Sequence, residues 1–254
     1  MLKLKDSVSS SKMLSEALQK NGASHKSYKM YTSMDRALEI LVSGHLYLFD
    51  GNNWNDKSDR DTMKAKSAFA KCFSCSTNEN VAMWMLYGNK AGKNGAMLNF
   101  YHSTINLLIN VKYIELGKFS EKRKFDSVYT LNSDADYEIF ATDIIYAEKC
   151  SNGKVKLTLG DEHITTNDSI LDDADVFYKK YPWSYEKECR LVVRIADKWN
   201  EVAVQQNLNC IRLTIPESHL KKLKDGRLIR SPIYSGWLDY GEPSLLTGDV
   251  DWNL

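Results

Sequence analysis

The sequence predicts an α+β fold, in which a split, mixed or antiparallel sheet is flanked by helices. Helical and strand patterns mingle along the chain without the regular alternation that a doubly wound parallel sheet requires. The chain has 254 residues, 43% of them hydrophobic, and no repeat, low-complexity tract or linker rich in Pro, Gly or Ser divides it. We therefore expect a single domain whose core needs neither disulfides nor metals.

The first residues predict an accessory helix ahead of this domain. Residues 9–22 combine Ser residues that can cap a helix, apolar residues at helical spacing, and a closing Asn21-Gly22. We expect this N-terminal accessory helix within residues 1–24 and a single α+β domain of catalytic type over residues 25–254.

The next four segments predict a strand, a helix, a strand and a loop. Residues 27–31 are of β type, and residues 32–44 have a capping-box spacing, one apolar stripe and a terminal Gly. Residues 45–49 alternate as a strand does, and residues 50–61 are too rich in Asn and Asp to continue it.

The remaining segments add strands and three helices, while residues 116–139 carry no clear pattern. The expected strands are 70–78, 95–101, 144–150, 154–159, 184–195, 209–215 and 227–234, and the expected helices are 80–88, 173–181 (stopped before Pro182) and 216–226.

Composition narrows the classes of function. The chain has 34 Lys+Arg against 33 Asp+Glu, which argues against a protein whose main partner is a phosphate backbone, although a local basic groove at residues 219–230 stays open. No apolar run approaches the ~20 residues that span a bilayer, and no secretory signal begins the sequence. The 5 Cys residues are scattered. We expect a cytoplasmic protein with reduced thiols and no membrane partner.

Two carboxylates stand out in the late strand. Strand alternation places Glu186, Glu188 and Arg190 on one face, with neighbouring positions about 6.5–7 Å apart. Such acids can serve different parts of one reaction centre. The alternative is a solvated strand face whose charges pair across the ladder.

Five segments, in their order, resemble the signature of domain-of-unknown-function family 2971, which is common in bacterial genomes. They are residues 28–31, 46–56, 71–88, 95–100 and 183–192. The family usually has a second Trp where this chain has Cys189 and a Pro where it has Lys57. Neither difference removes a candidate polar group.

Three of these segments are also similar to ADP-ribosyltransferase motifs. The Glu-x-Glu sequence at 186–188 resembles the closing motif of that class, residues 73–77 resemble its middle Ser-Thr-Ser strand, and Tyr28-Lys29 occupies the place of its early Arg, His or Tyr. The resemblance implies an ADP-ribosyltransferase-like fold and NAD as substrate. Two departures are a lysine in place of a bidentate arginine and the long separation of Ser74 from Glu188, which demands a large insertion.

The resemblance also implies roles for individual residues. Glu188 would stabilise the oxocarbenium-like transition state, and Glu186 would orient or deprotonate the acceptor. No resident metal is implied. The expected NAD-binding residues are Tyr28, Lys29, Asn55, Asp56, Ser74, Ser76, Trp84, Tyr87 and Arg190.

The expected activity is therefore transfer of ADP-ribose from NAD to a protein or nucleic-acid acceptor. The resemblance suggests a bacterial toxin or phage-defence effector, for which a neutralising antitoxin is a plausible partner. One alternative is a metal-dependent nuclease, should Asp56 and Asp59 join Glu186 and Glu188 around metal ions. Another is a non-catalytic module that binds a nucleotide or a partner. We assign no metal or redox role to the C-x-x-C at 72–75 and no role to any of the 5 His residues.

Overall fold

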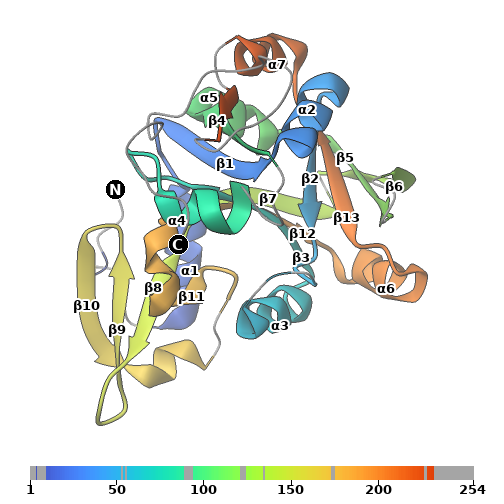
Figure 1. The fold of residues 1–254 in the computed structure, drawn as a ribbon. Helices are drawn as coiled ribbons and strands as arrows, with labels where there is room; N and C mark the ends of the chain where they lie inside the picture. Colours follow the sequence, from blue (N-terminus) through green and yellow to red (C-terminus); the bar gives the residue numbers. More distant parts are fainter. Residues whose placement is uncertain are drawn as a thin grey trace.

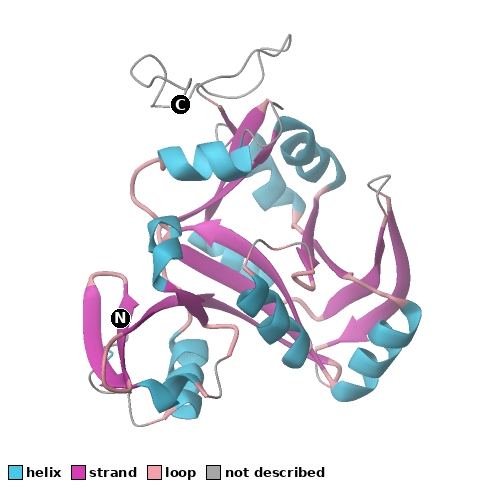
Figure 2. Ribbon diagram, turned by 60° about the horizontal axis from the view of Figure 1, so that its bottom comes forward, coloured by secondary structure: helices cyan, strands magenta, loops and turns pink. Residues whose placement is uncertain are grey.

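Two β-sheets and their flanking helices make up the fold in the computed structural model (Figures 1 and 2). The structure describes residues 4, 10–52, 54, 56–88, 94–120, 124–133, 135–172, 175–225 and 228–231. The α-helices are α1 (Ser11–Asn21), α2 (Met34–Ser43), α3 (Lys57–Ala65), α4 (Val81–Met83), α5 (His102–Leu108), α6 (Asp197–Gln206) and α7 (Glu217–Lys224). A π-helix, η2 (Trp84–Gly88), and two 3-10 helices, η4 (Asp168–Leu171) and η5 (Tyr181–Glu186), accompany them.

The larger sheet is antiparallel at every described pairing. Its order is β14-β4-β1-β3-β2-β13-β5-β6, with β12 paired to β3 and β7 paired to β12. The strands of this sheet are β1 (Ser27–Ser33), β2 (His45–Phe49), β3 (Ala68–Ser74), β4 (Gly95–Tyr101), β5 (Tyr113–Phe119), β6 (Phe125–Asn132), β7 (Tyr137–Asp143), β12 (Glu188–Ile195), β13 (Cys210–Thr214) and β14 (Leu228–Arg230).

Strand β3 is where this sheet divides. One of its edges pairs with β12 along its whole length. The other edge is shared, because Ser74 pairs with Lys29 of β1 and Ala70 pairs with Phe49 of β2. Strands β1 and β2 therefore separate along one edge of β3.

The smaller sheet is an insertion between two neighbouring strands of the larger one. Its order is β10-β9-β8-β11, and β11 runs parallel to β8 (Figure 1). Its strands are β8 (Ile145–Lys149), β9 (Lys154–Leu159), β10 (Glu162–Asn167) and β11 (Tyr178–Lys180). The chain enters this sheet after β7 and leaves it before β12, and β7 and β12 pair with each other. The insertion thus accounts for much of the long separation between Ser74 and Glu188.

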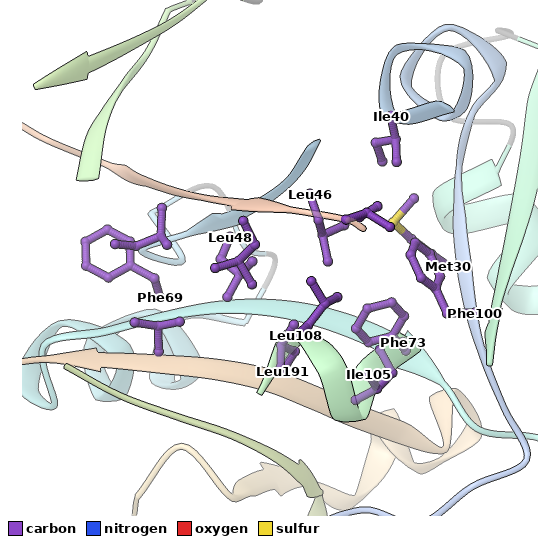
Figure 3. Close-up of a cluster of buried hydrophobic side chains, with 14 of the residues drawn as sticks. Met30, Ile40, Leu46, Leu48, Phe69, Phe73, Phe100, Ile105, Leu108 and Leu191 are labelled. Carbon is purple, nitrogen blue, oxygen red and sulfur yellow. The ribbon is translucent and has the colours of Figure 1, made fainter. Parts of the chain in front are cut away.

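Side chains of β12 alternate between two apolar clusters. Leu191 and Val193 belong to the main core, together with residues of α2, α5, α6 and α7, whereas Val192 belongs to a second cluster under the smaller sheet. Figure 3 shows part of the main core, where Leu48 and Phe73 gather with Leu191 between the strands that carry them. Burial on both faces explains the apolar run Leu191, Val192 and Val193 within β12.

The expected N-terminal helix forms and packs on β7. Leu14 and Leu18 are buried in the second cluster, and the Ala23 amide donates to the carbonyl of Ala141 at 2.9 Å. No described helix is long and apolar enough to cross a membrane.

Three local expectations are wrong, and each correction bears on the site. Residues 57–61 begin α3 instead of continuing a loop, because Asp56 caps that helix. Residues 178–180 form β11 and Tyr181 begins η5 instead of continuing a helix, since the ladder with β8 outweighs the helical pattern. Glu186 is consequently not on the strand: Lys187 adopts a left-handed backbone with φ 43°, and β12 begins at Glu188.

Candidate active site

A cavity of about 270 Å³ opens where β1 and β2 separate along β3. The loop before α3, the π-helix η2 and the segment from β11 to β12 complete its walls. Its lining includes Lys29, Tyr31, Phe49, Trp54, Asp56, Asp59, Cys72, Tyr87, Lys179, Trp183, Glu186 and Glu188. Four separate parts of the chain that carry predicted site residues therefore meet here.

Lys179 joins the two glutamates. Its Nζ donates to Oε2 of Glu186 at 2.5 Å and to Oε2 of Glu188 at 2.9 Å, and it lies 5.1 Å from the centre of the Trp183 ring. Although burial opposes it, the attraction of the two carboxylates raises the pKa of Lys179 above its usual value. The smaller sheet thus supplies a permanent cation between the two acids.

Arg190 holds Glu188 from the other side. Its Nε donates to Oε1 of Glu188 at 2.6 Å, and its Nη1 and Nη2 donate to the two oxygens of Asp59 at 2.8 and 2.6 Å. The guanidinium has no exposed surface and lies 4.8 Å from the centre of the Trp54 ring. A bidentate pair of this kind fixes the orientation of the guanidinium and also neutralises the carboxylate.

The two glutamates differ in protonation. Burial would raise the pKa of Glu188, but Arg190 and Lys179 outweigh it and hold that pKa well below its usual range. Burial and the negative charge of Glu188 raise the pKa of Glu186, and Lys179 and Tyr87 only partly compensate. One site therefore holds a carboxylate that stays ionised and a second that binds a proton more readily.

Tyr87 links the π-helix to Glu186. Its hydroxyl donates to Oε1 of Glu186 at 2.6 Å. The neighbouring Asn80 caps α4 and donates through Nδ2 to the carbonyl of Tyr185 at 2.6 Å. These two bonds hold the segment from α4 to η2 against η5.

A polar row crosses three adjacent strands beside the cavity. Ser74 is the cross-strand partner of Lys29 on β1 and of Glu188 on β12. The Ser74 side chain is fully buried, and its Oγ has no hydrogen-bond partner among the described residues. The Lys29 ammonium donates to the carbonyls of Ser76 and Thr77, and burial lowers its pKa.

Tyr28 and Trp84, which were also predicted to bind NAD, do not line the cavity. Tyr28 is fully buried in the main core, and its hydroxyl donates to the carbonyl of Ala23 at 2.7 Å. Trp84 is buried against Tyr31 outside the cavity, and its Nε1 donates to Glu79 at 2.8 Å. Asp56 lines the cavity and caps α3.

Two more of these predicted residues add little to the cavity. Ser76 meets Lys29 through its main-chain carbonyl. Asn55 lies outside the described residues.

Lys179 is not among the predicted site residues, and Asp59 is grouped with the glutamates only in the nuclease alternative. Lys179 fell in a segment expected to be helical, and Asp59 was considered only as a metal ligand. Both reach the site through tertiary contacts, for which the sequence offers no local signal. Trp183 is the first residue of the segment 183–192 that resembles the family, and this resemblance pointed to that part of the site.

The four acids of the nuclease hypothesis are not arranged as a metal centre. Asp59 and Glu188 share Arg190, and Asp56 caps α3. In the part of the chain that the structure describes, no three His, Cys, Asp or Glu side chains are grouped to hold a metal ion.

Comparison with known proteins supports the family resemblance. The model of a family described as protein of unknown function (DUF2971) matches residues 83–191. This span contains Tyr87, Lys179, Glu186, Glu188 and Arg190. No curated protein and no solved structure matches the chain. The predicted resemblance to this family is thereby confirmed.

Proposed function

We propose that the protein transfers ADP-ribose from NAD to a macromolecular acceptor and releases nicotinamide. One observation carries the proposal. Lys29, Ser74 and Glu188, which come from three separate segments, are direct cross-strand partners beside a cavity that also contains Glu186. These are the three segments whose order resembles that of the transferase motifs.

The state of Glu188 suits the bond-breaking step. Cleavage of the bond between the ribose C1′ and nicotinamide leaves positive charge on the ribose, while nicotinamide departs with the electron pair. A carboxylate that stays ionised stabilises this charge. Arg190 and Lys179 keep Glu188 ionised, and its oxygens retain lone pairs that can accept from a ribose hydroxyl.

The state of Glu186 suits the second half of the reaction. The acceptor forms a new bond to C1′ and loses a proton, which a nearby carboxylate can take up. The raised pKa of Glu186 brings it closer to neutral pH, where a general base works best. Tyr87 and Lys179 hold the two oxygens of this group in place.

The shape of the cavity suits one half of the dinucleotide. A volume of about 270 Å³ lies near the lower end for small-ligand pockets, roughly 300–1,000 Å³, and the rings of Trp54, Tyr87 and Trp183 offer surfaces for nicotinamide. A second cavity of about 500 Å³ shares Asp59 and Lys179 with the first. We place the remainder of NAD there. The acceptor is a protein or a nucleic acid, in the setting of a toxin or a phage-defence effector.

Calorimetric titration of NAD, with nicotinamide release followed in the same sample, tests this function. The wild-type protein should bind NAD and release nicotinamide, and Glu188→Gln should abolish release while a folded protein still binds NAD. Glu201→Gln on α6 is the matched control, since Glu201 is exposed. Absence of both binding and release from the folded wild-type protein would contradict the proposal. Activity on nucleic acid that requires Mg²⁺ would favour the nuclease.

A non-catalytic nucleotide-binding module is the second candidate. The observation in its favour is the burial of Glu188 and Arg190, since ion networks of this kind also serve structure alone. This candidate expects NAD binding without any nicotinamide release.

A further inference from the structure

We propose that Cys75 is a thiol that reacts with hydroperoxides and that Cys189 is its disulfide partner. The two cysteines belong to a cluster with His25 and Asp143, which the function proposed above does not use. The cluster packs on the main core, on the face of β12 opposite to Glu188 and Arg190.

Four side chains of this cluster are in contact. One ring nitrogen of His25 lies 2.5 Å from Oδ1 of Asp143. Ser74 pairs with Glu188 across the ladder between β3 and β12, so Cys75 and Cys189, the residues that follow them, lie near each other at the end of this ladder, and both pack in the main core. Cys189 is also the cross-strand partner of Asp143, so the ladder between β7 and β12 holds these two groups side by side.

The backbone around the cluster is held by further bonds. The Cys75 amide donates to the Lys187 carbonyl at 2.8 Å, and the His25 amide donates to the Tyr28 hydroxyl at 3.1 Å. Tyr28 in turn donates to Ala23, in the turn before β1. The buried tyrosine that was expected to meet NAD therefore positions His25.

These contacts favour a thiolate paired with an imidazolium. The hydrogen bonds to Asp143 and Cys75 outweigh burial and raise the pKa of His25 to about 10. Burial opposes ionisation of Cys75, but the hydrogen bonds from Cys189 and His25 lower its pKa. A thiolate is the nucleophilic form of cysteine. Burial raises the pKa of Cys189, which therefore stays a thiol.

Exposure separates the two cysteines. Cys75 is partly exposed, and the side chains of His25 and Asp143 keep 30% of their surface each. Cys189 is 1% exposed. A small oxidant therefore meets Cys75 first, and Cys189 lies behind it in contact with its sulfur.

The chemistry is a two-electron oxidation of the dithiol. The Cys75 thiolate attacks one oxygen of the hydroperoxide, the O–O bond breaks, and the departing oxygen takes a proton from the His25 imidazolium. The Cys75 sulfenic acid is then attacked by the Cys189 sulfur. The S–S bond forms, and the sulfenic hydroxyl leaves as water with the Cys189 proton. Hydrogen peroxide thus yields two waters.

Cys72 is not the expected partner, although it forms a C-x-x-C with Cys75. Its thiol hydrogen-bonds to Glu188, so it lies on the opposite face of β3. Cys75 lies just past the last residue of β3, and Lys187, which has a left-handed backbone, directly precedes β12. The two cysteines therefore lie at the end of the ladder between β3 and β12, and a disulfide would join their sulfurs at about 2.05 Å.

Hydrogen peroxide titration of the reduced full-length chain tests the proposal. Remaining thiols are alkylated, and peptide mass spectrometry locates the products. We expect a disulfide between Cys75 and Cys189 that survives Cys72→Ser. In Cys189→Ser the reaction should stop at a sulfenic acid on Cys75, trapped by dimedone.

Substitution of Asp143, which pairs with His25, provides a second test, with the rate of Cys75 oxidation as the readout. Asp143→Asn should slow the oxidation of Cys75 by about tenfold, because loss of the imidazolium raises the thiol pKa. Cys150→Ser is the control, since Cys150 is exposed and lies outside the cluster. Thermal unfolding verifies that each variant is folded. A disulfide between Cys72 and Cys75, or oxidation of Cys75 no faster than that of Cys150, would overturn the proposal.

Discussion

Glu186 and Glu188 are only two residues apart in the same site, but their surroundings differ. Glu188 belongs to an inner network with Asp59 and Arg190, whereas Glu186 lies at its edge, between Lys179 and Tyr87. The inner acid has two cations against it and a depressed pKa, and the outer acid shares one cation with its neighbour and has a raised pKa. The difference teaches that partners, more than burial, set the charge of a buried carboxylate.

Removing the cation of the inner network should have the largest effect. Arg190→Met leaves Asp59 and Glu188 buried with a single nearby cation, Lys179. We expect a loss of about 3–5 kcal/mol in the free energy of unfolding, measured by urea denaturation. Arg212→Met is the matched control, because Arg212 and Glu115 form a partly exposed pair, with 23% and 28% of their side-chain surface exposed, and surface pairs contribute about 0–1 kcal/mol. Equal losses in the two variants would mean that Arg190 contributes no more to the free energy of unfolding than an arginine in a surface pair.

Amide substitutions of the two acids should separate their roles in the proposed reaction. Glu188→Gln removes the charge that faces the ribose and should slow nicotinamide release by about 10²–10³-fold. Glu186→Gln should slow transfer to the acceptor by about 10²–10⁴-fold and nicotinamide release to water by less. Rates of both processes, measured on the same preparations, check this. Parallel losses in the two variants would remove the distinction between the acids.

The raised pKa of Glu186 predicts a pH-dependent stability. A carboxyl whose pKa is higher in the folded protein binds its proton more tightly there, so its contribution to stability is present below about pH 4.5 and is lost as pH rises through the folded value. The free energy of unfolding of Glu186→Gln, relative to that of the wild type, should therefore be higher at pH 7 than at pH 4.5. The expected increase is about 1.4 kcal/mol for each unit by which the pKa of Glu186 is raised. Urea unfolding at the two pH values measures it. A difference that shrinks with rising pH would mean that the pKa is lowered.

The smallest effect on stability is expected for Lys180, an exposed residue next to the inner network. Lys180 follows Lys179 in β11, but its side chain is 66% exposed and lies 3.9 Å from Asp56. Lys180→Met should change the free energy of unfolding by less than about 0.5 kcal/mol, because exposed pairs are weak. Thermal and urea unfolding check it. A loss of stability comparable to that of Arg190→Met would mean that Lys180 also belongs to the inner network.

Much of the local structure follows from the sequence. The helix in 32–44 and the strands in 45–49 and 95–101 are confirmed, because capping, helical spacing and alternation are local properties. Helices α5 and α6 were not predicted. The segment that became β11 was misassigned, since its ladder partner lies in a distant strand, β8.

The sequence by itself determined which strands carry the polar groups and in what order: Lys29 first, Ser74 next and Glu188 last. The alternation of apolar and polar residues in strands and the Glu-x-Glu spacing are local properties of the sequence, so these groups could be found without coordinates. Only the tertiary structure decided that Lys179 from an inserted sheet lies between the glutamates and that Cys75 meets Cys189 instead of Cys72. These contacts join residues that no periodicity connects. The first depends on how the two sheets pack, and the second on how the end of β3 meets β12 within the larger sheet.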